Sequence, residues 1–426
     1  MRIAVIGGGW AGLAAAVEAT TAGHEVTLFE MAAVAGGRAR RLPQGLPGLA
    51  LDNGQHILIG AYAQTLELLR RCGVEEAQVL HRMPLRLLDA RGRGLSLPPG
   101  AAMPAFVRGV LSASGFRWSE RIALLRMATG WLLSGFRCNP SLSVAQLTAR
   151  TPAAVRRHLI DPLCVAALNT PSAQASASVF LRVLRDALFS GPGASDLLLP
   201  RVDLGTLWPD AASQWLVGHG AQLRLGQRVM ALEPGPGGWR VDDEPFDAAV
   251  LASSALEAAR LAHAHAPQWA NVAQALQYEP IVTVLVYAPA MKRLPAPIVA
   301  LDADDVHPAQ YAFDLQQLRD GGATDTLAFV ISGARSWTDR GLDATGEAVL
   351  AQARGELGLG PDARVLRTLS EKRATFLCTP GLVRPAARIA ARLYAAGDYV
   401  DGPYPATLEG AVRSGVAAAR ALTHDA

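Results

Sequence analysis

The sequence has few cysteines and few charged residues. The 426-residue chain has four cysteines, and they are far apart and form no C-x-x-C pair: Cys72, Cys138, Cys164 and Cys378. This spacing provides no framework for a metal site or a redox dithiol, so we expect no metal, and free thiols in a reducing cytoplasm. Only 18% of the residues are charged and half are hydrophobic. Such a composition leaves apolar surface that can contact a hydrophobic ligand or a membrane.

Long apolar runs and dense basic tracts are also absent. No run reaches the roughly eighteen apolar residues of a membrane-spanning helix. The net charge is only +3, and the basic residues are spread along the chain rather than clustered as in nucleic-acid-binding proteins. The apolar N-terminus has no signal-peptide cleavage site. We therefore expect a cytoplasmic protein of two or three domains that does not bind nucleic acid.

The chain begins with a pattern typical of a dinucleotide site. The β-branched run from Ile3 to Ile6 predicts a buried parallel strand, and the alanine-rich stretch from Ala11 to Ala22 predicts a helix. A second strand is expected from Val26 to Phe29. Three glycines at G-x-G-x-x-G spacing follow the first strand: Gly7, Gly9 and Gly12.

Each residue of this pattern has a physical role. Gly7 permits a tight turn, Gly9 lets a pyrophosphate approach the backbone, and Gly12 lets the helix pack closely on the sheet. The N-terminus of this helix, near Trp10 and Ala11, presents free N–H groups and the positive end of the helix dipole to the phosphates.

An acidic residue completes the pattern. Glu30 lies eighteen residues after Gly12, where a carboxylate can accept the ribose hydroxyls. Met31 follows it, so there is no arginine at this point to bind a 2′-phosphate. The pattern predicts FAD or NAD rather than NADP, and the alternative is a glycine-rich structural turn.

Two later stretches are candidates for further cofactor contacts. Gly37 and Arg38 form part of a second candidate phosphate loop, in which Arg38 would neutralise the pyrophosphate; the alternative is a surface turn with a solvated arginine. Gly54 belongs to an Asp-Asn-Gly turn. Gln55 and His56 follow it and could reach the reactive end of the cofactor, although a single histidine beside an apolar run is often structural.

The segment from residue 101 to residue 137 differs in character from the rest. It combines aromatic and aliphatic residues with five arginines and one acid. Such a basic amphipathic segment is typical of helices that lie in a membrane interface. The alternative is an ordinary lid or substrate-domain helix with a solvated face.

The second half of the chain predicts a return to the first sheet. A strand at 246–253 and a helix at 255–262 are typical of a Rossmann-like unit. Strands of a second sheet are expected at 280–287, 311–315 and 327–332. Asp398 ends a late buried strand, where it can bind cofactor sugar hydroxyls, unless it is only a turn or N-cap residue. A helix is expected to begin near Ala406 and to direct its positive end at the cofactor ring.

These residues together resemble the flavin amine oxidase and phytoene desaturase superfamily over the whole chain. The internal stretches 51–62, 167–171 and 196–204 resemble more narrowly the hydroxysqualene dehydroxylases of bacterial hopanoid synthesis. The resemblance implies an α/β fold: a Rossmann-like FAD-binding domain, discontinuous in sequence, with a second α+β substrate domain. We expect residues 1–85, 205–275 and 376–426 in the FAD-binding domain and residues 86–204 and 276–375 in the substrate domain.

The resemblance also implies roles for individual residues. The glycines of the first loop and Arg38 would hold the pyrophosphate of FAD, and Glu30 its adenosine ribose. A strand around Val229 would contact the adenine, and Asp398 the ribityl or phosphate end of the flavin. The implied reaction is the reductive removal of an allylic hydroxyl. The resemblance supplies no acid or base for it, and His56 and Tyr404 are our own candidates for the proton donor.

Other functions remain open at this point. An oxidative desaturase of a carotenoid-type polyene would use the same flavin in the opposite direction. A non-catalytic carrier of prenyl lipids would keep FAD for structure, whereas an amine oxidase is less expected because no aromatic cage is recognisable. Expected partners are a small isoprenoid substrate, the inner face of a membrane through residues 101–137, and neighbouring squalene-pathway enzymes.

Overall fold

The fold is built on a mainly parallel sheet, here called the first sheet, that contains the N-terminal strand. The computed structural model describes residues 1–46, 48–289, 291–319 and 325–425. In these residues six strands form the first sheet in the order β18-β19-β12-β1-β2-β8. Their bounds are Arg2–Ile6 (β1), Glu25–Glu30 (β2), Gln222–Leu225 (β8), Ala248–Leu251 (β12), Arg388–Ala390 (β18) and Leu393–Ala395 (β19). β1 is buried from Ile3 to Ile6, as expected for a central strand covered on both faces.

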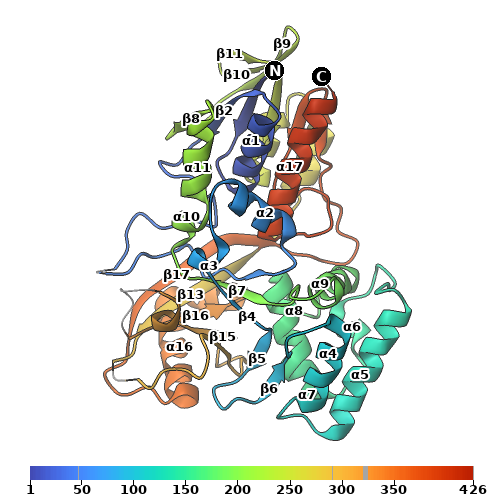
Figure 1. Ribbon diagram of the computed structural model, residues 1–426, viewed down its shortest axis with the longest axis vertical. Coiled ribbons are helices and arrows are strands. Elements are labelled where there is room, and N and C mark those ends of the chain that lie inside the picture. The colour runs from blue at the N-terminus through green and yellow to red at the C-terminus, as the bar shows by residue number, and fades with distance from the viewer. Residues whose placement is uncertain (47, 290, 320–324, 426) are drawn as a thin grey trace.

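Alanine-rich helices pack on the first sheet at close range. α1 (Trp10–Thr21) and α17 (Leu408–His424) lie side by side (Figure 1). A Cβ on Gly415 would come within 2.1 Å of the Ala11 carbonyl oxygen, so only glycine permits this approach. The same half of the molecule contains α2 (Ala63–Arg71), α3 (Glu76–Val79), α10 (Leu204–Leu207), α11 (Pro209–Gly218), α12 (Ala255–Ala262) and α13 (Pro267–Gln274).

An antiparallel sheet, here called the second sheet, lies below the first in Figure 1. Its described strands follow the order β14-β15-β16-β13-β17. Their bounds are Tyr278–Tyr287 (β13), Ile298–Ala300 (β14), Tyr311–Asp314 (β15), Thr326–Ile331 (β16) and Arg364–Phe376 (β17). Three of these strands were predicted. β17 was not, because its many polar and charged residues hide the apolar alternation of a strand. The nearby helices are α14 (Leu315–Leu318), α15 (Arg335–Arg340) and α16 (Leu342–Leu357).

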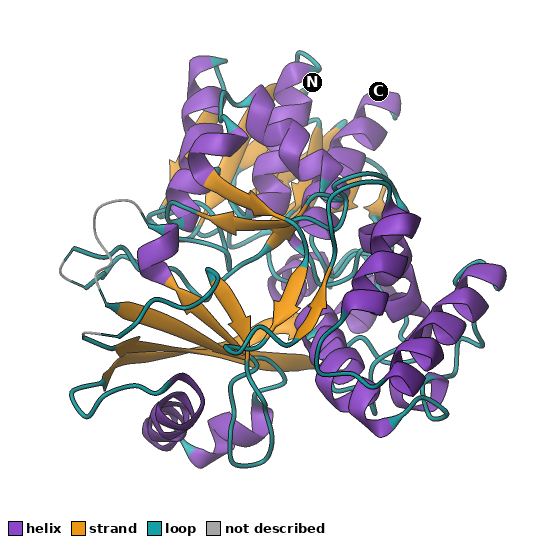
Figure 2. Cartoon of the chain, turned by 60° about the horizontal axis from the view of Figure 1, so that its bottom comes forward, coloured by secondary structure: helices purple, strands orange, loops and turns teal. Residues whose placement is uncertain are grey.

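A helical group flanks the second sheet (Figure 2). It consists of α4 (Ala102–Ser112), α5 (Trp118–Leu133), α6 (Val144–Leu147), α7 (Ala153–Val155), the π-helix η1 (Arg156–Ile160), α8 (Asp161–Leu168) and α9 (Ala177–Phe189). Short strands connect this group to the rest of the fold: β3 (Leu58–Ile59), β4 (Leu80–Met83), β5 (Arg86–Leu88), β6 (Gly94–Ser96) and β7 (Leu197–Pro200). Within the described ranges, no helix is long and apolar enough to cross a membrane.

A small antiparallel sheet extends the first half of the molecule. It contains β9 (Leu232–Gly235), β10 (Gly238–Val241) and β11 (Glu244–Phe246). The prediction of a strand around Val229 is wrong. β8 ends at Leu225, and Gly226, with a φ of +73°, turns the chain into a loop that carries Val229. The left-handed backbone of Gly226 stops the pairing that the apolar pattern favoured.

The two sheets draw their strands from different segments of the chain. The described strands of the first sheet lie within residues 2–30, 222–251 and 388–395, and those of the second sheet lie between Tyr278 and Phe376. The helical group falls within 86–204. This arrangement brings the carboxyl ends of β1, β2 and β12 to face the second sheet.

Candidate functional site

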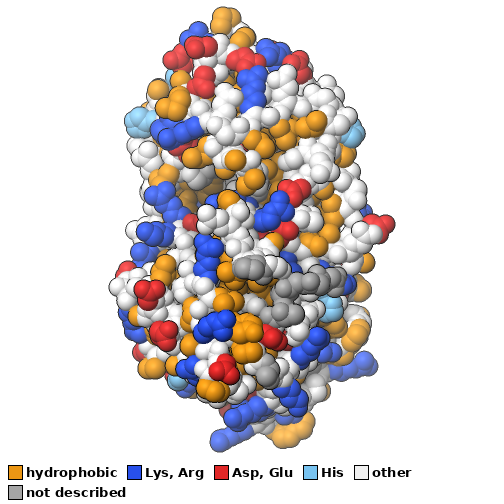
Figure 3. All heavy atoms as spheres, turned by 90° about the vertical axis from the view of Figure 1, so that its left-hand side faces the viewer, with side chains coloured by type: hydrophobic (Ala, Val, Ile, Leu, Met, Phe, Trp, Pro, Cys, Tyr) orange, Lys and Arg blue, Asp and Glu red, His pale blue; other side chains and the backbone are white. Residues whose placement is uncertain are grey.

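A cavity of about 830 Å³ lies between the two sheets. Its wall includes Gly7 and Glu30 from the first sheet, Thr283 from the second sheet and Leu124 from the helical group. The molecular surface is hollowed in its upper middle part in Figure 3, where hydrophobic side chains are visible between lysine and arginine side chains. The position agrees with the rule that ligands of α/β sheets bind at the carboxyl ends of the strands.

The first-sheet end of the cavity is a cradle of glycine backbone. Gly7 has a φ of +116°, and a Cβ there would stand 2.6 Å from the backbone of Ala252. A Cβ on Gly37 would stand 3.0 Å from the Cα of Gly9, so the two predicted glycine loops touch. α1 begins at Trp10 with no side chain capping its N–H groups. A bare backbone surface at an uncapped helix N-terminus fits the pyrophosphate of a dinucleotide.

Gly12 does not line this cavity, although it was predicted among the cofactor-binding residues. A Cβ on Gly12 would come within 1.8 Å of the Gly7 carbonyl oxygen. Its missing side chain therefore serves the packing of α1 against the turn after β1. The other predicted cofactor residues all line the cavity: Gly7, Gly9, Trp10, Ala11, Glu30, Gly37, Arg38, Gly54, Gln55, Val229 and Asp398.

Glu30 lies at the end of β2, where an adenosine ribose is expected. Its carboxylate accepts hydrogen bonds from the N–H groups of Gly8 at 2.6 Å and Ala32 at 2.8 Å. These bonds fix the carboxylate against the glycine loop and leave lone pairs for further donors. Val229 lines the same cavity from the loop after β8.

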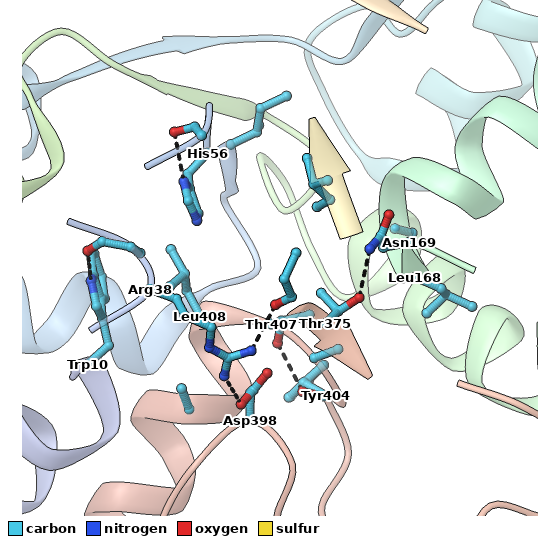
Figure 4. A pocket seen from close by; sticks show the side chains of 18 of the residues that line it. Trp10, Arg38, His56, Leu168, Asn169, Thr375, Asp398, Tyr404, Thr407 and Leu408 are labelled. Carbon is cyan, nitrogen blue, oxygen red and sulfur yellow. Dashed lines mark hydrogen bonds and ion pairs between the residues drawn. The ribbon is translucent and has the colours of Figure 1, made fainter. Parts of the chain in front are cut away.

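Arg38 and Asp398 form an ion pair in the cavity wall (Figure 4). Arg38 also donates through Nη1 to the carbonyl of Ala374 on β17, at 2.8 Å. Burial alone would lower the pKa of Arg38, but the Asp398 carboxylate raises it above the ordinary value. The guanidinium is therefore permanently charged and held in place. The two residues were predicted separately as cofactor contacts, and their pairing was not foreseen.

α17 directs its N-terminus at the cavity from the side of Asp398 (Figure 4). The Thr407 hydroxyl caps the helix by accepting the Gly410 N–H at 2.9 Å, and it donates to the Tyr404 carbonyl at 3.0 Å. Leu408 is the first helical residue and lines the cavity. The positive end of the helix dipole thus faces the space where a flavin ring would lie. The predicted start near Ala406 is correct to within two residues.

His56 lines the cavity as a neutral imidazole. Its Nδ1 donates to the Gly54 carbonyl at 3.2 Å, because a carbonyl oxygen can only accept. Burial lowers the pKa of His56, and the charge of Arg38 lowers it further. Nε2 is then an acceptor that faces away from Gly54. In this state His56 accepts a proton more readily than it donates one.

Tyr404 lines the cavity together with Asp186 of α9. Burial and the hydrogen-bonded Asp186 carboxylate raise the pKa of Tyr404, so the phenol keeps its proton. Burial would raise the pKa of Asp186, but hydrogen bonds from Arg185 and Tyr404 lower it below the usual range. This pair joins the helical group to the loop before α17.

Asn169 is a structural residue of the site that we did not predict. It ends α8 in a left-handed conformation, with a φ of 44°. Its Nδ2 donates to Thr375 Oγ1 at 3.0 Å and to the Glu279 carbonyl at 3.1 Å, and its Oδ1 accepts the Gly333 N–H at 2.7 Å. One amide therefore ties α8 to both long strands of the second sheet. The sequence signal was the Asn-Thr-Pro break between two helices, which indicates a turn but not its partners.

The far half of the cavity has an apolar wall. Leu124 and Trp131 of α5 and Ile281 of β13 are typical members. The segment 101–137 therefore contributes one face of its helices to the cavity. Among the residues that the structure describes, no cluster of three or more histidine, cysteine or acidic side chains could hold a metal ion.

Comparison with solved structures shows the fold. An oxidoreductase from Methanosarcina mazei has a TM-score of 0.72 at 18% identity, over 98% of this chain and 99% of that one. Cyclohexylamine oxidase from Brevibacterium oxydans has a TM-score of 0.69 at 19% identity, over 99% and 98%. This chain therefore shares its overall fold with these oxidases and oxidoreductases of diverged sequence.

Two curated relatives match this chain along nearly the whole length of both proteins, and a third matches only a short part. Hydroxysqualene dehydroxylase from Rhodopseudomonas palustris is 29% identical over 97% of this chain and 96% of that protein. The enzyme of the same name from Zymomonas mobilis is 26% identical over 99% of both chains. Zeta-carotene desaturase from Synechocystis is 37% identical, but over only 18% of this chain and 15% of that protein.

The family model described as flavin containing amine oxidoreductase matches residues 10–423. This match confirms the predictions of FAD as the cofactor and of an oxidoreductase activity. It also agrees with the glycine cradle, Glu30 and the Arg38–Asp398 pair. The chain belongs to the family of flavin-containing amine oxidoreductases.

Proposed function

We propose that this protein removes the hydroxyl of hydroxysqualene reductively and releases squalene. The observation that carries the proposal is similarity to hydroxysqualene dehydroxylases along both halves of the chain, at 24–29% identity over 97–99% of its length. The desaturase similarity covers only 76 residues, or 18% of this chain. An apolar cavity joined to a FAD cradle suits a long hydrocarbon substrate.

The reaction balances as the exchange of a hydroxyl for a hydride. The carbon–oxygen bond breaks, the hydroxyl leaves with one added proton as water, and the allylic carbon gains a hydride. The bound flavin, when reduced, supplies that hydride. The glycine cradle and the Arg38–Asp398 pair hold and orient the cofactor, and the apolar wall excludes water from the allylic cation.

We propose two residues as candidates for the proton donor. Tyr404 keeps its proton, and the ionised Asp186 carboxylate holds the phenol in place. His56 is neutral and needs prior protonation before it could donate. Replacement by Tyr404→Phe and by His56→Ala separates these roles. If both variants retain FAD and full turnover, neither residue is the donor.

The outer face of the helical group supports the proposal of peripheral membrane contact. On α5, Trp118 is 64% exposed and Leu133 is 83% exposed, while the inner side chains Leu124 and Trp131 line the cavity. Arg117 and Arg126 are exposed on the same helical segment, which suits anionic lipids. The double variant W118S/L133S should reduce sedimentation with anionic vesicles and leave the flavin spectrum unchanged. Equal sedimentation of both proteins would contradict the contact.

The direction of flavin chemistry tests the function against its alternative. Anaerobic protein with reduced flavin is mixed with hydroxysqualene, and the product is identified by mass spectrometry. Squalene with a returning yellow flavin band supports the proposal. Bleaching of the oxidised protein by a carotenoid-type polyene would instead support a desaturase.

A further inference from the structure

The side of the second sheet that faces the cavity carries a row of side chains across four strands. Tyr311 on β15 lies opposite Val330 on β16, Val330 lies opposite Thr283 on β13, and Thr283 lies opposite Leu369 on β17. Directly opposed residues point to the same face of a sheet, and all four residues line the cavity. The row places two hydroxyl groups on either side of Val330, with their Cβ atoms roughly 10 Å apart at the usual strand spacing.

One of these two hydroxyls, that of Thr283, is buried without a hydrogen-bond partner in the described part of the chain. Thr283 is 2% exposed, and its Oγ1 makes no hydrogen bond to any described group. Tyr311 is 8% exposed and lines the cavity. A buried hydroxyl that has lost water without gaining a partner is unfavourable. Thr283 also borders a small pocket lined by Asp52, Gln55 and Arg319, but on the side of the large cavity the wall is mostly apolar, and a ligand hydroxyl is the natural group to pair with Thr283 Oγ1.

Thr283 stands at the end of the wall that is close to the cofactor cradle. Its Oγ1 is 3.8 Å from the position that a Cβ on Gly54 would take. Asn53, which precedes Gly54 in the chain, donates hydrogen bonds to the Arg38 carbonyl and to the Glu371 carboxylate of β17, each at 2.9 Å. Thr283 is thus linked through one short loop to the Arg38–Asp398 pair, and Tyr311 lies two strands deeper in the substrate half.

We infer that Thr283 and Tyr311 form the subsite for the hydroxyl of an isoprenoid allylic alcohol, an inference that rests on the proposed function. The substrate oxygen accepts the Tyr311 O–H, and the substrate hydroxyl donates to Thr283 Oγ1. Burial raises the pKa of Tyr311, so the phenol stays protonated and donates at neutral pH. These residues position the reacting carbon beside the cofactor; they are positioning residues and not the proton donor.

The subsite explains how the protein would distinguish its substrate from its product. Hydroxysqualene and squalene share the hydrocarbon chain and differ at the hydroxyl. An apolar wall alone binds both nearly equally, whereas a site built for a hydroxyl disfavours an analogue that leaves its polar groups unpaired. The same contact that holds the substrate therefore weakens when the hydroxyl leaves, which favours product release.

The test compares substrate affinity with product inhibition in the holoenzyme. The variants are Thr283→Val and Tyr311→Phe, which remove the hydroxyls and keep the shape. The control is Val330→Ala, which changes the wall between them without changing a hydroxyl. The measured quantity is the Ki of squalene divided by the KM of hydroxysqualene. Each hydroxyl variant should lower this ratio about tenfold, since one hydrogen bond is lost. The control should move both constants together and leave the ratio unchanged.

A second measurement covers the folding of the variants. Thr283→Val should raise the melting temperature of the ligand-free protein, because it removes a buried unpaired hydroxyl. Wild-type ratios in both hydroxyl variants that still produce squalene would overturn the subsite and leave the proposed function intact. If the wild type produces no squalene, the proposed function fails. The subsite is then judged by direct titration of the oxidised holoenzyme, where equal affinity for hydroxysqualene and squalene overturns it.

Discussion

Asp52 is a buried carboxylate beside the cavity, and its titration tests whether burial or ion pairing dominates there. Its Oδ2 lies 2.6 Å from Nη2 of Arg319, and its Oδ1 accepts the Leu204 N–H at 2.8 Å. The exposed fractions of the two side chains are 3% for Asp52 and 11% for Arg319. Burial raises the pKa of Asp52 to about 6, although Arg319 and the Leu204 N–H oppose this shift.

The shift predicts how stability depends on pH. An aspartate in an unfolded chain titrates near pH 4, so a rise of about two units corresponds to about 3 kcal/mol of linked free energy. The folded protein binds this proton more tightly than the unfolded chain. The contribution of Asp52 is therefore fully present below about pH 4 and is lost as the pH rises through about 6.

The variant Asp52→Asn removes the titration and keeps the shape. Urea unfolding of both proteins at a series of pH values between 4 and 7 gives the difference in their free energies of unfolding. Loss of the ion pair with Arg319 adds an offset to the variant. Over this range we expect the wild type to lose about 2.4 kcal/mol relative to the variant, because part of the full change falls below pH 4. A difference that is constant, or that grows in favour of the wild type as the pH rises, would refute the reasoning and show that Arg319 outweighs burial.

Two further predictions concern the cofactor cradle and its supports. Asp398→Asn removes the charge that faces Arg38, so the dissociation constant of FAD should rise about tenfold in fluorescence titrations of the apoprotein, and an unchanged constant would contradict the assigned role. Glu409 is fully buried and accepts hydrogen bonds from the Gln64 N–H, the Thr65 N–H and the Thr65 hydroxyl. Glu409→Gln should lower the free energy of unfolding by about 1.5–3 kcal/mol in urea, because an amide presents only one acceptor atom to these donors. A stability equal to that of the wild type would show that α17 does not depend on this contact.

The parts of the fold with strong local signals could be predicted from the sequence. The turn at Gly7, the helix after it and Glu30 at the end of β2 depend on residues close together in the chain, and each is present. β17 escaped prediction because its residues are polar and its pairing with β13 is a tertiary contact. Val229 was placed in a strand because apolar periodicity does not report a left-handed glycine, and Gly226 breaks the strand.

The sequence identified many residues of the site but did not show how they contact one another. Arg38 and Asp398 were both expected to contact the cofactor, but their ion pair joins positions 360 residues apart. Thr283 looks like an ordinary strand residue in the sequence. Only the register of three strands shows that Thr283 and Tyr311 share the cavity face. Such partnerships depend on the packing of distant segments, and no local pattern encodes them.

The most direct test of the proposed reaction is an anaerobic single-turnover experiment in which the amounts of reoxidised flavin and of product are both measured. The flavin of the holoenzyme is reduced in full, an equal amount of hydroxysqualene is added, and absorbance of the oxidised flavin is followed while squalene is measured by mass. We predict one squalene formed for each flavin reoxidised, with both appearing at the same rate. Flavin that stays reduced while hydroxysqualene remains intact would contradict the reductive removal of the hydroxyl.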